Sequence, residues 1–335
     1  MLTSNSYHPP ITLRSAHLQT ILASTKFRAW GKNQLRDAAR EIIIETDDGI
    51  RLLGFHSEQT NRAAKGLVIL LHGWEGSSDS TYILRTSKIL YQNGYNIFRL
   101  NFRDHGDSHH LNQGIFYAVL LQEVYQGVRQ AAHFSGALPV FLVGFSLGGN
   151  FALRILRSCI AHPINDLCHT VSISPVLDPQ KSTTNIDRYP IIKSYFLKKW
   201  RTSLEKKQKL YPDLYNFDNA FSQKTLLEVT ETLLAEYSDF ASSAEYFKAY
   251  SVLNDAIKNI TVPTTIIAAA DDPIIPIEDF KNLEINDLTN LVIQPYGGHN
   301  GFLINWSLAS WYEQQLVNLF DGIVKDNLKP EASMA

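Results

Sequence analysis

The stretch at residues 139–150, PVFLVGFSLGGN, decides the fold that we predict for this chain. Its first half is a short apolar run typical of a strand buried on both faces, and a helical stretch follows at residues 150–158. The junction has the pattern Gly-x-Ser-x-Gly, in which a sharp strand-to-helix turn strains the serine backbone and projects its hydroxyl. Side chains at Gly144 and Gly148 would collide with the neighbouring strand and helix. Ser146 is therefore the candidate nucleophile.

Other short apolar runs alternate with helix-length segments on both sides of this stretch. The runs cover residues 66–71, 95–100, 170–174, 264–270 and 290–294, and the helical segments cover residues 81–93, part of 114–134, 146–161 and 303–323. Two β-rich runs, residues 40–45 and 51–55, flank a turn at Asp47-Asp48-Gly49 and predict an antiparallel hairpin at a sheet edge. The alternation predicts a mostly parallel central sheet flanked by helices. With the serine turn, it indicates the α/β-hydrolase fold.

Residues 177–260 differ in character from the rest of the chain. Aromatic and charged segments, such as residues 195–209 and 221–237, replace the short apolar strands there. We expect a helical cap, or lid, inserted into a single domain that spans residues 1–335. A chain of 335 residues is of ordinary length for one α/β domain that carries such an insertion.

Composition narrows the classes of partner. The chain has 31 lysine and arginine residues against 33 aspartate and glutamate residues. Its net charge therefore creates no electrostatic field that favours binding to nucleic acid or to an anionic surface. Cys159 and Cys168 are too few for a disulfide framework and lack the spacing of a zinc or redox motif. No apolar run approaches the roughly 18 residues of a membrane helix, and the first 14 residues lack a signal-peptide core. A soluble, cytoplasmic protein is expected.

A serine nucleophile needs a base, and the base needs an acid that orients it. In this fold the chain order is Ser, Asp, His, on loops after later strands. Asp272 follows the predicted strand at residues 264–270, and His299 follows the strand near residues 290–294 in a glycine-flanked loop. Asp271 competes with Asp272 but is expected to cap the turn. Asp178, one strand earlier, is a further alternative for the acid.

Acyl transfer also needs N–H donors aimed at the developing oxyanion, whose loss costs about 100-fold or more in rate. One donor is expected from the backbone of Leu147, directly after the nucleophile. The other is expected from Trp74, in the loop His72-Gly73-Trp74-Glu75-Gly76. His72 is expected to brace this loop by hydrogen bonds.

The segment RDHGDSHH at residues 103–110 gathers three histidines and two aspartates. It lacks an HExxH or comparable ligand pair on a helix, and it falls on the loop after a predicted strand. We therefore predict neither a metal site nor a cofactor, and expect these polar side chains to be solvated or to brace the site.

With these residues in hand, the chain resembles the YheT-like branch of α/β-hydrolases. The resemblance spans most of the sequence, and its most discriminating motif is His-Leu-Gln-Thr, within SAHLQTI at residues 15–21. The other motifs are HGWEGSSDSTY at 72–82, GFSLGGN at 144–150, ADDP at 270–273 and GGHNGF at 297–302. The resemblance implies a nucleophile, acid and base at Ser146, Asp272 and His299. Residues 111–116 depart from the family's Tyr-His-x-Gly stretch, so its phospholipid substrates are not carried over.

These observations predict a serine hydrolase that cleaves carboxylic esters with short- to medium-chain acyl groups. Trp74 and Phe145 are expected to line the acyl pocket, together with aromatic residues of the cap. One alternative is a lipase or phospholipase whose cap exposes an apolar face to a bilayer. An alternative of another class is a non-catalytic binding protein that keeps the fold and has lost turnover.

Overall fold

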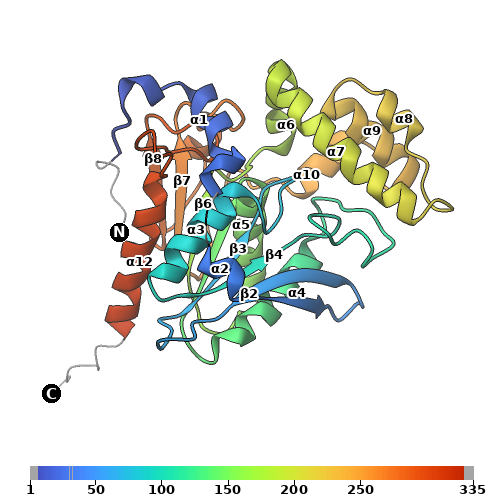
Figure 1. The fold of residues 1–335 in the computed structure, drawn as a ribbon. Coiled ribbons are helices and arrows are strands. Elements are labelled where there is room, and N and C mark those ends of the chain that lie inside the picture. Colours follow the sequence, from blue (N-terminus) through green and yellow to red (C-terminus); the bar gives the residue numbers. More distant parts are fainter. Residues whose placement is uncertain (1–6, 30, 32, 328–335) are drawn as a thin grey trace.

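A computed structural model describes residues 7–29, 31 and 33–327, which form one eight-stranded sheet with helices on both faces (Figure 1). The strand order is β1-β2-β4-β3-β5-β6-β7-β8. The strands are β1 (Ala39–Glu45), β2 (Arg51–Ser57), β3 (Leu67–Leu71), β4 (Asn96–Leu100), β5 (Val140–Phe145), β6 (Leu167–Ile173), β7 (Thr264–Ala269) and β8 (Thr289–Gln294). This is the predicted α/β-hydrolase fold.

The β1–β2 hairpin is antiparallel, with Glu45 opposite Arg51, and β2 also runs antiparallel to β4. Gly49 in its turn has φ +75°, which a side chain would oppose. Every pairing from β4 through β8 is parallel. Because the carboxyl ends of parallel strands lie on one edge, the loops after β3, β5, β7 and β8 meet there, and these loops carry the predicted site residues.

Helices cover both faces of the sheet. Among the longer ones, α3 packs on α12, and α4 packs on α5. The α-helices are α1 (Ala16–Ala23), α2 (Gln34–Asp37), α3 (Thr81–Gln92), α4 (Leu121–Ala132), α5 (Leu147–Cys159), α6 (Pro179–Arg188), α7 (Pro190–Leu210), α8 (Asp218–Ser222), α9 (Leu226–Tyr237), α10 (Ser243–Ala249), α11 (Ile277–Lys281) and α12 (Trp311–Asn327). Within the described ranges, no helix is both long and apolar enough to cross a membrane.

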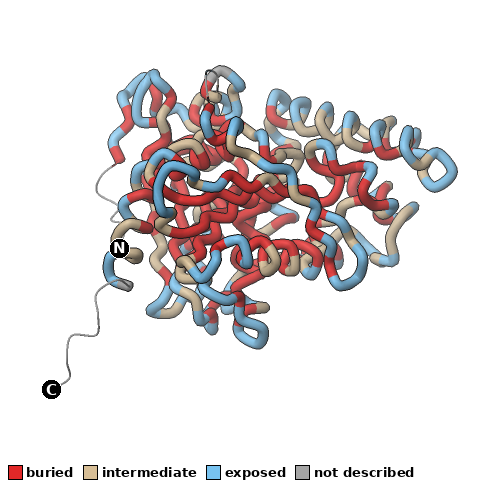
Figure 2. The backbone as a smooth tube through the Cα atoms, turned by 60° about the horizontal axis from the view of Figure 1, so that its bottom comes forward, coloured by how far each residue is buried: buried red, intermediate tan, exposed pale blue. Residues whose placement is uncertain are grey.

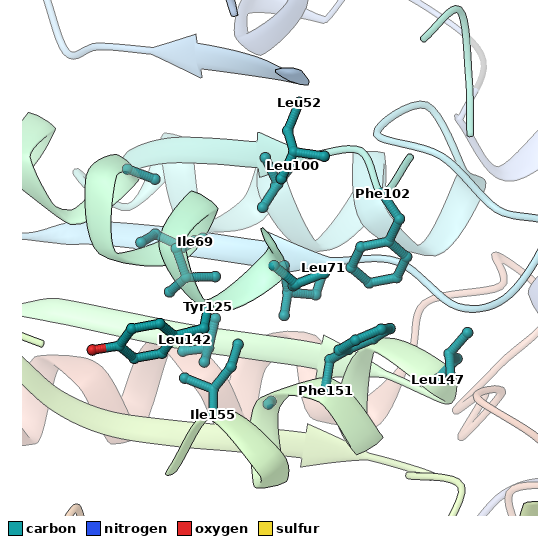
Figure 3. Close-up of a cluster of buried hydrophobic side chains, with 14 of the residues drawn as sticks. Leu52, Ile69, Leu71, Leu100, Phe102, Tyr125, Leu142, Leu147, Phe151 and Ile155 are labelled. Carbon is teal, nitrogen blue, oxygen red and sulfur yellow. The ribbon is translucent and has the colours of Figure 1, made fainter. Parts of the chain in front are cut away.

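The core lies on the two sides of the sheet, and strand alternation decides which side chain joins which half. In β3, Val68 and Leu70 join the half that contains α3 and α12, whereas Leu67, Ile69 and Leu71 join the half beside α4 and α5. Figure 3 shows Ile69 and Leu71 in that second half, beside Phe151 and Ile155 of α5. All of β3 is buried, and the buried residues form the centre of the molecule in Figure 2.

Five helices, α6 to α10, lie between β6 and β7 and gather at one end of the molecule, in yellow and orange in Figure 1. They have a small core of their own, which includes Leu204, Phe217 and Leu233. Tyr246 and Phe247 of α10 join the main core instead. These helices therefore pack on the sheet and its flanking helices through apolar side chains.

The last predicted helix begins later than expected. Residues 303–310 form a tight loop in which Leu303 and Ser310 make an antiparallel bridge, and α12 starts at Trp311. Leu308 in that loop has φ +59°, a conformation outside the helical region. The apolar side chains of Leu303 and Leu308 are buried, but they pack against α1 rather than along a helix stripe.

Candidate active site

Ser146 occupies the sharp turn between β5 and α5, as predicted. Its backbone has φ +53° and ψ −116°, a strained conformation for a residue with a side chain. The Ser146 N–H donates to the carbonyl of Ile173 on β6 at 2.9 Å, which fixes the turn against the sheet. A Cβ at Gly148 would overlap the carbonyl groups of Leu71 and His72. The tight approach of the turn to the end of β3 thus requires glycine.

His299 lies in the loop after β8 and reaches the serine. Its Nε2 atom is 2.9 Å from Ser146 Oγ. The loop turns through left-handed backbone conformations at Gly298 (φ +52°) and Asn300 (φ +61°), which place the ring over the serine. The imidazole is buried, and its other nitrogen faces a carboxylate.

That carboxylate belongs to Asp272, in the loop after β7. Oδ2 of Asp272 is 2.9 Å from His299 Nδ1. The second oxygen, Oδ1, accepts backbone N–H groups of Ile274 at 2.8 Å and Ile275 at 3.1 Å. The backbone therefore holds the Asp272 carboxylate in place through Oδ1, while Oδ2 faces the imidazole of His299. The geometry is an unbroken row from acid through histidine to serine, as acid–base-assisted nucleophilic attack requires.

The two alternative acids have other partners. Asp178 is the N-cap of α6, where its side chain accepts the N–H of Lys181 at 3.1 Å. Asp271 accepts the N–H of Gly298 at 2.9 Å, so it ties the loop that carries His299 to the loop after β7. Burial raises the pKa of the Asp271 carboxyl, and the hydrogen bond from Gly298 opposes that rise.

The loop after β3 brings the N–H of Trp74 to the same edge as the N–H of Leu147. Neither N–H group has a hydrogen-bond partner among the described residues. His72 is fully buried, with Nδ1 2.8 Å from the Gly73 carbonyl and Nε2 accepting the Phe102 N–H at 3.2 Å. Burial lowers the pKa of His72 well below its usual value, so the ring is neutral and braces the loop. Trp74, Ser146 and Leu147 line the same cavity, so these two N–H groups stay the candidate donors to an oxyanion.

A cavity of about 110 Å³ opens beside Ser146 and His299. Its walls come from both the sheet domain and the inserted helices, and most are apolar. Trp74 stacks on Phe196 of α7 with ring centroids 5.3 Å apart and meets Trp200 edge-on at 4.8 Å. Other apolar lining residues include Ile115, Leu147, Val176, Ile186, Leu226, Leu234, Tyr246, Phe247 and Ile274.

Phe145 does not line this cavity, contrary to the expectation from sequence. Its ring is fully buried on the opposite side of the sheet, 5.0 Å from the ring of Tyr82 and 5.7 Å from that of Tyr312. The reason is the alternation of β5, in which Phe141, Val143 and Phe145 point to the α3 and α12 side. An all-apolar strand gives no sign in its sequence of which side chains face which layer.

The segment at residues 103–110 braces the wall of the cavity. His105 Nδ1 is 2.7 Å from the Arg103 carbonyl, and its Nε2 accepts the Glu75 N–H at 3.2 Å. His109 Nε2 is 2.8 Å from Ser203 Oγ on α7, and Asp104 pairs with Lys207 of the same helix. Among the described residues, no group of three His, Cys, Asp or Glu side chains has metal-binding geometry.

Sequence reasoning missed Glu75 and Lys207 as residues of the cavity wall. Burial raises the pKa of the Glu75 carboxyl to about 8, although Lys199 nearby acts against the rise. Lys207 lies about a hundred positions from Asp104, so only the packing of α7 on the sheet domain brings the two together. No local pattern in the sequence marks such a contact.

Comparison with known proteins agrees with this architecture. The sequence matches the family described as serine aminopeptidase, S33, over residues 62–286. An abhydrolase domain-containing protein of Dictyostelium discoideum is 25% identical, over 96% of this chain and 82% of that protein. The protein YheT of Escherichia coli is 23% identical, over 90% of this chain and 88% of its own length.

Solved structures show the same fold. A structure of the Pyrococcus furiosus esterase Pf2001 superposes with a TM-score of 0.56 at 17% identity, covering 87% of this chain and 96% of that chain. The family match spans well over half of the residues, and the relatives include YheT. This chain is therefore a hydrolase of the serine aminopeptidase S33 family of α/β-hydrolases, within the YheT-like branch.

Proposed function

We propose that the chain cleaves carboxylic esters through an acyl-enzyme intermediate, with Ser146 as nucleophile, His299 as general base and Asp272 as the acid. One observation carries the proposal: the hydrogen-bonded row Asp272–His299–Ser146 opens directly onto an apolar cavity. The serine hydroxyl alone is a weak nucleophile at neutral pH, and the histidine supplies the base that it lacks.

In this mechanism, His299 Nε2 takes the hydroxyl proton as Ser146 Oγ attacks the ester carbonyl. Asp272 holds the Nδ1–H tautomer and stabilises the imidazolium that forms. The N–H groups of Trp74 and Leu147 donate to the carbonyl oxygen as it becomes negative. The imidazolium then protonates the leaving alcohol. Water, activated by His299, hydrolyses the acyl-enzyme and releases the acid.

The cavity supports a short- to medium-chain acyl group. Its walls are mainly aromatic and aliphatic, and Phe196 and Trp200 bound it. Each methylene buried against such walls contributes about 0.8 kcal/mol of binding. Residues 177–260 act as the cap in this proposal, because Phe196 and Trp200 of α7 close the cavity over Trp74.

A fluorophosphonate probe and p-nitrophenyl esters of two to sixteen carbons test the proposal together. We expect covalent labelling of the wild type and turnover with an optimum at short to medium chains, and neither with Ser146→Ala. Labelling that persists in Ser146→Ala would move the nucleophile elsewhere. A folded wild type that neither labels nor turns over any ester would favour the non-catalytic binding protein.

A lipase or phospholipase is the second candidate, and exposed apolar side chains at the start of α7 favour it. Ile191 is 72% exposed and Tyr195 is 46% exposed, one helical turn apart on the cap. Vesicle flotation of the wild type and of Ile191→Asp separates the two functions. Binding by the wild type that the substitution abolishes would favour interfacial action, and no binding by either would favour the esterase.

A further inference from the structure

We propose that helix α1 positions the general base, with Thr20 as the positioning residue that fixes the backbone of His299. This inference rests on the proposed function, in which His299 is the base. It assigns a role to the His-Leu-Gln-Thr motif, which the reaction itself does not use. Thr20 touches neither the serine nor the cavity and acts only through the histidine loop.

The Thr20 hydroxyl makes two hydrogen bonds that give it one orientation. It donates to the carbonyl of Ala16 one turn earlier in α1, at 2.8 Å. It accepts the backbone N–H of His299 at 2.9 Å. Because the hydroxyl proton of Thr20 points at the Ala16 carbonyl, the lone pairs of the same oxygen point at the N–H of His299. Helix α1 thus holds the Thr20 oxygen in place as the acceptor. Without the Thr20 hydroxyl, the N–H of His299 would lose its hydrogen-bond partner in a part-buried site, which disfavours this position of the loop.

The histidine loop lies so close to α1 that side chains cannot fit between them. A Cβ at Gly298 would overlap the Ala16 carbonyl and lie 2.8 Å from Thr20 Oγ1. A Cβ at Gly301 would lie 2.8 Å from the Gln19 carbonyl. The glycines on both sides of His299 therefore serve this close approach, and the loop cannot shift toward α1.

Gln19 fixes the far end of the same loop. Its side chain is fully buried, and its Oε1 accepts the N–H of Leu303 at 2.7 Å. Its Nε2 donates to the hydroxyl of Tyr7 at 2.9 Å and to the carbonyl of Leu13 at 2.7 Å. The loop from Gly298 to Leu303 is thus hydrogen-bonded to α1 at both ends. Asp271 holds the third contact, at Gly298.

The other residues of the motif serve the placement of α1. Ser15 is the N-cap, and its hydroxyl accepts the N–H of Leu18 at 3.4 Å. The ring of His17 meets that of Tyr189, between α6 and α7, edge-on at 4.8 Å. One face of α1 therefore contacts the cap while Gln19 and Thr20 hold the base, so the helix lies between the two.

Thr20→Val tests the proposal, because it keeps the shape of the side chain and removes the hydroxyl. A displaced base lowers the turnover rate, and a shift of about 1 Å lowers it by about 100-fold. We expect kcat for p-nitrophenyl butyrate to fall between tenfold and 100-fold with KM within twofold of wild type. Thr20→Ser restores the hydroxyl and is expected to recover most of kcat. Thr25→Val is the matched control, since Thr25 donates to Leu22 at 2.8 Å and does not touch the loop.

A second readout does not depend on turnover. The proton between His299 Nδ1 and Asp272 is expected to give a downfield proton resonance, identified by its loss in Asp272→Asn. In Thr20→Val this resonance is expected to shift or broaden, while Thr20→Ser and Thr25→Val keep it. If the wild type hydrolyses no ester, the proposed function fails, and this resonance still decides whether Thr20 positions the ring.

Two outcomes would overturn the proposal. One is a folded Thr20→Val protein with wild-type kcat and an unchanged resonance. The other is an equal loss of activity in Thr20→Val and Thr25→Val, which would mean that any hydroxyl in this segment serves only stability. If Thr20→Val does not fold, Thr20→Ala replaces it, because alanine is the best helix former and leaves α1 intact.

Discussion

The ammonium group of Lys207 and the carboxylate of Asp104 lie 2.8 Å apart, with only 1% and 7% of their side chains exposed. Lys207 also donates to the carbonyl of Asn112 at 2.7 Å, and the other Asp104 oxygen accepts the N–H of Phe116 at 3.0 Å. The pair therefore joins α7 to the sheet domain at the wall of the cavity, with its charges fully hydrogen-bonded.

Breaking this pair is expected to destabilise the protein strongly. Lys207→Met leaves the Asp104 carboxylate buried without a counter-ion, so the free energy of unfolding falls by about 3–5 kcal/mol in urea denaturation. Lys206→Met, on the exposed side of α7, is the control and is expected to change little. The double variant Asp104→Leu, Lys207→Met is expected to recover part of the loss. Equal free energies of unfolding for Lys207→Met and Lys206→Met would show that the Asp104–Lys207 pair contributes nothing to stability.

Substituting Asp272 and Asp178 separately tests which of the two carboxylates is the acid that orients His299. Asp272→Asn is expected to lower kcat by about 10⁴-fold with a small change in KM, because the amide favours the wrong histidine tautomer. Asp178→Asn keeps the N-cap of α6 and is expected to retain wild-type kcat. Steady-state kinetics on one ester decides between them. Inactivation by Asp178→Asn alone would place the acid after β6.

Trp74 is expected to set the length of acyl chain that the cavity accepts. Its indole lines the cavity and contacts the rings of Phe196 and Trp200, which line it too, so Trp74→Ala enlarges the cavity. The optimum across the p-nitrophenyl ester series is expected to move to longer chains. Trp306→Ala, at an exposed tryptophan, is the control. An unchanged profile in Trp74→Ala would remove this residue from the acyl pocket.

Glu75 makes stability depend on pH. Burial raises the pKa of its carboxyl from 4.5 to about 8, so between these values the folded protein keeps a proton that the unfolded chain has released. The free energy of unfolding therefore falls as pH rises through this window. Glu75→Gln removes the titration and is expected to exceed the wild type in stability at pH 9 while matching it at pH 4.

Thermal unfolding at the two pH values measures this difference. Glu205→Gln, at an exposed position of α7, supplies the control and is expected to track the wild type at both pH values. A wild type as stable as Glu75→Gln at pH 9 would mean that the ionised carboxylate finds water or a cation in the cavity.

The sequence was sufficient to predict features that depend on local patterns. The β1–β2 hairpin, the buried parallel strands and the turn at Ser146 follow from periodicity and glycine placement, and the positions of Asp272 and His299 follow from strand order. The side of the sheet to which Phe145 points was missed, because an all-apolar strand hides its alternation. The ion pair of Lys207 with Asp104 and the hydrogen bond of His299 to α1 were also missed, because these contacts form only when distant segments pack together.

The hydrogen bond between Thr20 and His299 joins residues 279 positions apart in the chain. Contacts of such long range must overcome the entropy of closing a long loop, and folds that depend on them form slowly. The turn at Ser146 needs only nearby strands, so a partly folded chain carries its serine without an aligned base. Under the proposed mechanism, full hydrolytic activity therefore requires that α1 has packed against the loop of His299, and it reports on completed folding.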